Sequence, residues 1–255
     1  DNNDNAYIMD KSTIYKYDIS GATKNDSSLQ ALALSGRNLT LMMGGSGIAS
    51  DNDKFESPIT FSVYKNDLYV IDQRKDYTAG YLKVYDTNFN FKNLYNITTD
   101  LKKYPTVDVL PIKSGVFVLT LSGHILEYDN DITLVKVHKP NDKVDLTSET
   151  FKKLESSKEN DNVFYVLTDK NVFKKYKSKP SKTINRFQSS RMANVTAPGY
   201  SAISVKLSGS NDELFLSDRP ASYTYIHRCI ENTGYQDAFY NDFQPQIFEL
   251  SSLHV

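Results

Sequence analysis

The stretch that decides the fold covers residues 55–91 and reads FESPITFSVYKNDLYVIDQRKDYTAGYLKVYDTNFNF. It contains three short segments rich in Val, Ile, Tyr and Phe, at residues 58–63, 68–72 and 81–86. Asn, Asp or Gly residues bound each segment, and this pattern predicts antiparallel β-hairpins. Residues 93–98 are predicted to form the outer strand of the same unit.

Weaker copies of this unit recur along the chain, and short turns such as Ser122-Gly123 join their strands. The predicted strands of the copies are residues 6–10 and 14–18; 107–112, 115–120, 124–129 and 133–138; 163–168 and 172–176; and 202–207, 213–218 and 223–228. Further strands are predicted at residues 29–34, 39–43, 238–240 and 246–250.

The last residue of the second strand marks the repeat. These residues are Asp10, Asp72, Thr120, Thr168 and Asp218, and they recur about every 50 residues. A repeat of this length, with a small antiparallel sheet as its unit, is typical of an all-β protein of the β-propeller type. A ring of such sheets covers the faces that a single sheet would expose. A β-sandwich of hairpins is the alternative, but it gives no reason for equal spacing.

The sequence predicts a single β-propeller domain over residues 1–255, with about five blades and room for a sixth. The first copy begins at its second strand, and the segment at residues 246–250 is left over. If that segment supplies the missing inner strand, the N- and C-terminal strands pair and close the ring. The chain starts at Asp1 without an initiator Met, so we expect a processed chain or a piece of a longer one.

Long polar connections are expected at residues 73–81, 141–162 and 180–199. Within the second of them, residues 147–156 have a composition that suits one or two helical turns. Propeller loops gather at the two faces of the ring, so contacts with partners are expected from these three connections.

Composition argues against several classes of protein. The chain has 30 Lys and Arg against 31 Asp and Glu, so there is no electrostatic case for nucleic acid or an anionic membrane. No apolar run approaches the roughly 20 residues of a membrane-spanning helix. Cys229 is the only cysteine, which excludes an intramolecular disulfide and a cysteine metal cluster. A single cysteine favours a reducing compartment or a virion particle, and secretion stays open.

Residues 44–86 resemble an NHL repeat. The resemblance rests on the Gly-rich lead GGSG, on Phe55 and Pro58 before the inner strand, and on the strand sequences LYVID and LKVYD. It covers one unit well and four others in part, since two units have Thr where the Asp would stand. The resemblance implies a propeller, and it implies no single activity, because propellers host binding modules, lyases and hydrolases alike.

No nucleophile elbow, phosphate-binding loop or dinucleotide fingerprint is present, so we expect neither enzyme activity nor a cofactor. Asp10, Asp72 and Asp218 stand at matching positions and are the candidate metal ligands. The simpler interpretation is that each accepts backbone N–H groups of the following turn, and that Arg74 pairs with the nearby aspartate. His124 and His227 are predicted in third strands, where a metal site is not expected, and His138 has no ligand-like spacing either.

Candidate partner-binding residues fall in three places. The connection at residues 73–81 supplies Arg74 and Tyr77. A basic run could contact an acidic partner or nucleic acid, although a solvated outer strand is the simpler interpretation. The aromatic segment at residues 235–248 has more rings than one short strand can bury, and these rings either form an exposed contact patch or pack as the closing blade. The candidates from these two segments are Lys174, Lys175, Tyr176, Tyr235, Phe239, Tyr240 and Phe243.

These features favour a non-catalytic β-propeller that acts as a rigid platform for binding other proteins in a larger assembly. The bias towards Lys, Asn and Tyr resembles that of AT-rich genomes, as in some phages and protists, which suggests a phage virion or tail component. Two alternatives stay open: a metal-assisted hydrolase or lyase on an NHL-like propeller, and a carbohydrate- or peptide-binding module.

Overall fold

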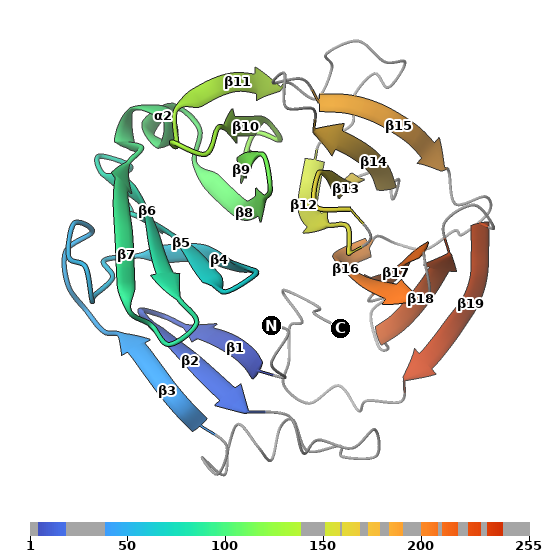
Figure 1. The fold of residues 1–255 in the computed structure, drawn as a ribbon, viewed down its shortest axis with the longest axis horizontal. Helices are drawn as coiled ribbons and strands as arrows, with labels where there is room; N and C mark the ends of the chain where they lie inside the picture. Colours follow the sequence, from blue (N-terminus) through green and yellow to red (C-terminus); the bar gives the residue numbers. More distant parts are fainter. Residues whose placement is uncertain are drawn as a thin grey trace. The chain divides into compact units, whose positions relative to one another are not determined.

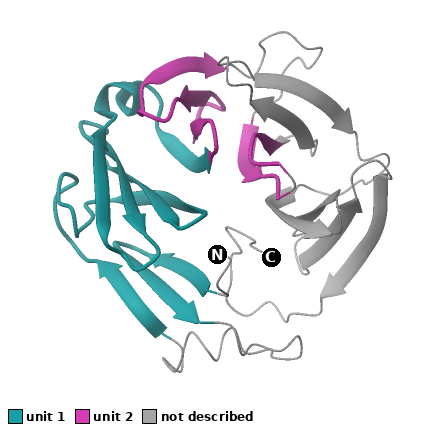
Figure 2. Cartoon of the chain, in the orientation of Figure 1, with its two compact units in different colours: residues 1–111 teal, residues 112–255 magenta. Residues whose placement is uncertain are grey.

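The computed structural model describes residues 5–18, 39–138, 151–158, 160–168, 173–178, 184–190, 200–208, 211–218, 224–230 and 234–241, with side chains up to residue 166. These residues form antiparallel sheets and one short helix (Figure 1). The chain divides into two compact units, residues 1–111 and 112–255 (Figure 2). A single domain over the whole chain stays a prediction.

The first unit contains a three-stranded sheet, in the order β1-β2-β3, and a four-stranded sheet, in the order β4-β5-β6-β7. The strands are β1 (Asn5–Asp10), β2 (Thr13–Asp18), β3 (Leu39–Gly44), β4 (Pro58–Tyr64), β5 (Asp67–Gln73), β6 (Gly80–Asp86) and β7 (Phe91–Asn96). The short helix α2 (Thr98–Lys103) follows β7, and β8 (Thr106–Ile112) lies at the boundary between the units.

Three further sheets follow, each with four strands in chain order: β8 to β11, β12 to β15, and β16 to β19. Their strands are β9 (Gly115–Thr120), β10 (Ile125–Tyr128), β11 (Leu134–His138), β12 (Phe151–Ser156), β13 (Val163–Thr168), β14 (Phe173–Ser178), β15 (Ile184–Ser190), β16 (Tyr200–Ser208), β17 (Asn211–Asp218), β18 (Thr224–Ile230) and β19 (Gly234–Asn241).

The predicted class is confirmed: the chain is all-β, and its described part is a succession of five small antiparallel sheets of the β-propeller type. The strands predicted between residues 58 and 138 coincide with β4 to β11 to within a few residues. The strands predicted at residues 29–34 and 246–250 lie outside the described residues. Closure of a ring by the terminal strands therefore stays a prediction.

Two of the predicted connections are wrong in part, because each contains a strand. Residues 151–156 form β12 and not helical turns. The register of β12 shifts between Phe151 and Lys153, and this irregularity hides the two-residue alternation that identifies a strand. Residues 184–190 form β15, whose sequence INRFQSS is too polar to stand out as a strand. An end strand can be polar because it pairs along one edge only.

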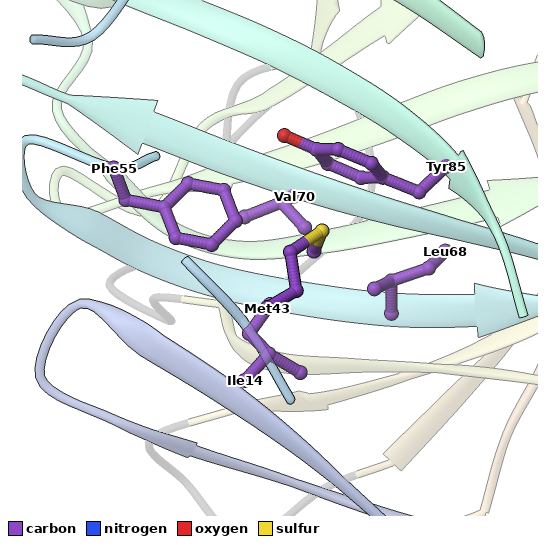
Figure 3. Close-up of a cluster of buried hydrophobic side chains, with 6 residues drawn as sticks. All are labelled: Ile14, Met43, Phe55, Leu68, Val70 and Tyr85. Carbon is purple, nitrogen blue, oxygen red and sulfur yellow. The ribbon is translucent and has the colours of Figure 1, made fainter. Parts of the chain in front are cut away.

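A hydrophobic cluster joins the two sheets of the first unit. Its six buried members are Ile14, Met43, Phe55, Leu68, Val70 and Tyr85 (Figure 3). Ile14 and Met43 point from the three-stranded sheet towards the side chains of β5 and β6. The Phe55 ring packs edge-on against that of Tyr85, with 6.2 Å between ring centroids. A residue that precedes β4 thus belongs to the core.

The second and third sheets share one kind of turn. Asp86 ends β6, and its carboxylate accepts the backbone N–H groups two and four residues further on, at 2.8 and 2.9 Å. Asp129 follows β10 and accepts the two equivalent N–H groups at 3.1 and 2.9 Å. Phe89 and Ile132 occupy the same turn position with φ of 66° and 57°. The repeat in the sequence is therefore also a repeat in hydrogen bonding.

Candidate functional site

A buried ion pair lies at the centre of the second sheet. The Nζ of Lys83 in β6 is 2.8 Å from Oδ2 of Asp72 in β5, and both side chains are fully buried. Lys83 stands opposite Val70, and Asp72 is the next residue on the same face of β5, which makes the two charges diagonal neighbours. A buried pair of charges is stable only when its other hydrogen-bonding positions are also filled.

The chain that enters β4 fills the positions on Asp72. Its Oδ1 accepts the N–H of Ser57 at 2.8 Å, and its two oxygens lie 3.2 and 3.1 Å from the N–H nitrogen of Glu56. The interpretation of Asp72 as an acceptor of backbone N–H groups is confirmed. The donors, however, precede β4, whereas the sequence suggested the turn after β5. Both carboxylate oxygens are therefore engaged within the fold.

Lys83 holds the same segment from its other side. Its Nζ donates a hydrogen bond to the backbone oxygen of Lys54 at 2.6 Å and lies 5.0 Å from the centre of the Phe55 ring. The hydroxyl of Tyr85, two residues further along β6, donates to the backbone oxygen of Asn52 at 2.8 Å. Residues 45–57, which we call the entry segment, are thus fixed to β5 and β6.

The loop between β5 and β6, residues 74–79, is held by bonds within itself. The N–H of Arg74 donates to the oxygen of Ala79 at 2.9 Å, and the N–H of Tyr77 donates to the oxygen of Arg74 at 2.8 Å. Asp76 accepts the hydroxyl and the N–H of Thr78 at 2.6 and 3.0 Å. The Thr78 hydroxyl, then its N–H, hold the pKa of the Asp76 carboxyl below its usual value.

Arg74 connects this loop to the entry segment. Its Nε is 3.0 Å from Oε1 of Glu56 and 3.5 Å from Oδ2 of Asp76. The other oxygen of Glu56 accepts the N–H of Ala49 at 3.1 Å. The predicted pairing of Arg74 with Asp72 is wrong, because Asp72 is buried and satisfied within the sheet. The ion pairs of Arg74 are exposed, so they position the side chain more than they stabilise the fold.

Two exposed apolar side chains belong to the same two segments. Ile48 of the entry segment is 61% exposed, and Tyr77 of the β5–β6 loop is 41% exposed. We call the exposed part of residues 45–57 and 74–79 the loop surface. It combines an aliphatic, an aromatic and a guanidinium group on loops that hydrogen bonds hold in place. Such a surface is suited to contact another protein.

The helix α2 supports the base of the β5–β6 loop. The buried amide of Gln73 donates to the backbone oxygen of Leu101 at 3.1 Å and accepts the N–H of Thr106 at 3.2 Å. Leu101 lies so close to Gly80 that a Cβ added at Gly80 would be 2.9 Å from Cδ1 of Leu101.

No helix among the described residues has the length and apolar character needed to cross a membrane.

The candidate metal ligands are in different surroundings. Asp10 ends β1 and is exposed, and Asp218 ends β17. His124 comes just before β10, with its Nδ1 2.8 Å from the Ser122 Oγ, and His227 lies in β18, the predicted third strand. Among the residues whose placement is described, no group of three His, Cys, Asp or Glu could hold a metal ion.

The other partner-binding candidates lie in two strands of the second unit. β14 contains Lys174, Lys175 and Tyr176, and β19 contains Tyr235, Phe239 and Tyr240. β14 pairs with both β13 and β15, so the basic run is not on the outer strand that the sequence predicted. Phe243 lies outside the described residues.

A second buried polar pair was missed by sequence reasoning. The Nε2 of His138, at the end of β11, is 2.7 Å from Oε2 of Glu127 in β10, and both residues are buried. The pair depends on the register of two strands, which no ligand spacing reveals. The available signal was a charged residue inside an apolar strand: Glu127 in ILEY, and likewise Lys83 in YLKVYD.

No family model matches the chain, and no curated protein matches its sequence. Solved structures similar to it include the Neurospora crassa Pan2 WD40 domain, with 10% identity and a TM-score of 0.46 over 72% of this chain and 49% of that chain. The N-terminal domain of Nup159 has 9% identity and a TM-score of 0.45, over 91% and 58%. BBS1N, solved in complex with ARL6DN, has 10% identity and a TM-score of 0.49, over 80% and 62%.

The chain spans less than two thirds of the length of each of these solved structures. At such identities the likeness concerns the fold alone. The propeller class stated above rests on the succession of sheets in this chain, and the NHL resemblance rests on the residues quoted for it.

Proposed function

We propose that this chain is a non-catalytic scaffold that binds another protein through the loop surface, as part of a larger assembly. The observation that carries the proposal is that exposed side chains stand on loops whose backbone is held in place by hydrogen bonds. Ile48, Arg74 and Tyr77 present their side chains to solvent, while the buried pair of Asp72 and Lys83 holds the entry segment to β5 and β6.

A fixed loop binds at a lower cost than a mobile one. Ordering a side chain at an interface costs about 0.5–1.5 kcal/mol, and ordering the loop that holds it adds to this cost. A loop whose backbone is already ordered avoids the added part. Tyr and Arg are also the residue types that carry much of the binding energy in protein interfaces. Tyr77 and Arg74 meet both conditions, because the loop that holds them is closed by its own hydrogen bonds.

The backbone of Tyr77 supports a contact role. Its φ of 59° lies in the left-handed region, where a residue with a Cβ is less stable by about 1–2 kcal/mol. Gly adopts this conformation without that cost. A large aromatic side chain that is 41% exposed at such a position supports a contact with a partner.

The assembly we propose is a phage virion or tail, in which the chain is a structural component. The compositional bias towards Lys, Asn and Tyr supports this, and so does the single cysteine. We also propose an NHL-type propeller, closed by pairing of its terminal strands. The resemblance of residues 44–86 supports the NHL type.

The test is co-purification of the tagged chain from the cells or particles that contain it, with partners quantified by mass spectrometry. The first double variant is Arg74→Ala with Tyr77→Gly, which alters the loop surface and relieves the left-handed backbone. The matched control is Lys92→Ala with Asn93→Ala on β7, at two exposed positions. It also removes a surface ion pair, in which the Nζ of Lys92 lies 2.6 Å from Oδ1 of Asp67.

We expect the loop variant to lose its main partner by about tenfold or more, which matches the loss of one strong contact residue. The β7 variant keeps the partner, and both variants unfold in urea at nearly the midpoint of the parent chain. Equal retention in the two variants would refute the loop surface as the binding site. Equal loss would show that the contact is not specific to it.

A further inference from the structure

The outer edge of β3 is a second surface that needs explanation. β3 pairs with β2 along one edge and has no second partner among the described residues. Its sequence is LTLMMG, and Leu39, Leu41 and Met42 are 38%, 36% and 68% exposed. The free edge of a strand carries N–H and C=O groups that a further strand can pair with.

The other end strands of the five described sheets are protected, and β3 is not. Charged residues and proline at a sheet edge hinder pairing with another strand, because a charge would be desolvated and proline lacks an N–H. β3 contains neither. The protecting residues in the other end strands include Asp10 in β1, Pro58 in β4, Lys92 in β7, Asp108 in β8, Lys136 in β11, Lys152 in β12, Arg186 in β15, Lys206 in β16 and Asp237 in β19.

The apolar character of β3 continues across its sheet. Met42 is paired with Tyr15, and Tyr15 with Ile8, so the three side chains form a row on one face. Ile8 is 44% exposed, and the Tyr15 ring lies 6.5 Å from that of Tyr17. Among the described residues, the row of side chains that runs from the free edge to β1 is therefore uncharged as well as apolar on this face.

We propose that β3 is the docking edge for an extended, uncharged strand of another protein, which adds to the first sheet beyond β3. Main-chain hydrogen bonds along the edge supply affinity in this mode of recognition, and the side chains of alternate residues supply specificity. The lack of charge along β3 selects an equally uncharged partner strand. An apolar strand covers Leu39, Leu41 and Met42 without desolvating a charge, whereas a charged strand would bury an unpaired one.

This docking edge extends the proposed protein-binding function to a surface other than the loop surface. The two sites are altered by different residues, so each can fail without the other. Loss of the β3 contact would leave co-purification through Arg74 and Tyr77 unaffected.

The experiment is amide hydrogen exchange of β3 in the whole chain, alone at two protein concentrations and with a probe. The probe is a capped synthetic peptide of alternating Thr and Val. Leu41→Lys places a charge on the β3 edge. Asn93→Lys, at an exposed position of β7, places the same charge on an edge that already has Lys92 and is the matched control. A thermal melt checks that both variants stay folded.

We expect the β3 amides to exchange rapidly in the chain alone and to slow by about tenfold or more when the peptide pairs with them. Leu41→Lys abolishes the slowing, and Asn93→Lys preserves it. Slow exchange without peptide at every concentration overturns the proposal, since residues of this chain would then cover the edge. Protection that rises with protein concentration overturns it in favour of a second copy. No slowing with the peptide overturns it outright.

Discussion

The second and third sheets each bury a polar pair that involves their third strand, but the two pairs hold different parts of the chain. In the second sheet, Lys83 binds Asp72 on the second strand, and both bind the entry segment. In the third sheet, Glu127 binds His138 on the fourth strand. Thr120 takes the position of Asp72 there, and its Oγ1 accepts the N–H four residues further on. One sheet fixes a preceding segment, and the other closes its own turn.

The difference teaches why the loop surface belongs to the second sheet. An ammonium and a carboxylate buried together need further hydrogen bonds, and the entry segment provides them. Fixing that segment is therefore part of stabilising the pair. The pair of Glu127 and His138 lies between two adjacent strands, and its bond requires no loop. A preceding segment that is fixed to the sheet follows from the first arrangement and not from the second.

The largest expected effect is at Asp72, and it tests the difference between the two buried pairs. Asp72→Ala leaves the Lys83 charge buried without a partner, and we expect the free energy of unfolding to fall by about 3–5 kcal/mol. Urea unfolding measures it, and limited proteolysis reports cleavage within residues 45–57. Asp67→Ala is the control, because it removes a more exposed ion pair with Lys92 and should cost less than about 1 kcal/mol. Similar losses in the two variants would contradict the role of the buried pair.

An intermediate effect is expected at Glu127. Its size relative to the effect at Asp72 tests how the two buried pairs differ. Glu127→Leu removes the partner of His138, but a neutral ring costs less to bury unpaired than a charged ammonium group does. We therefore expect a loss of about 1–3 kcal/mol, less than for Asp72→Ala, and no new proteolytic cleavage in residues 45–57. Urea unfolding again measures the loss, with Lys136→Ala as a nearby exposed control. A loss as large as that at Asp72 would remove the distinction between the pairs.

The smallest expected effect is a loss of stability at alkaline pH that comes from a tyrosine of the second sheet. Burial, and then the charge of Asp67, raise the pKa of Tyr69 in β5 to about 12. A raised pKa means that the folded chain disfavours the phenolate. The stability that this contributes is complete below about pH 10, the ordinary value of tyrosine, and is lost as the pH rises through 12.

Melting temperatures between pH 8 and pH 12 test this expectation. We expect Tyr69→Phe to lose less stability than the parent chain above pH 10, because one ionising group is gone. Tyr77→Phe, at an exposed tyrosine, is the matched control. Identical alkaline slopes for Tyr69→Phe and the parent would show that Tyr69 does not contribute.

The sequence predicted the strands that are short apolar runs between turn residues, and it missed the polar ones. β5 was predicted because LYVID is rich in Val, Ile and Tyr and lies between turn residues. β12, FKKLES, was missed because it is polar and its register shifts after Phe151. Arg74 and Tyr77 were found through their loop. The bond between Lys83 and Asp72 depends on which residues face each other in β5 and β6, and that register cannot be derived from one strand sequence alone.

The attachment of the entry segment also has a consequence for synthesis of the chain. Lys54 leaves the ribosome 29 residues before Lys83, the residue that will bind its backbone oxygen. At about 5–20 residues per second, Phe55 spends about 1.5–6 s in water before its place in the core exists. Chaperones and proteases that recognise extended apolar segments have access during that interval. Synonymous codons that slow translation over residues 58–83 would lengthen it and lower the yield of folded chain, although the finished protein would be identical.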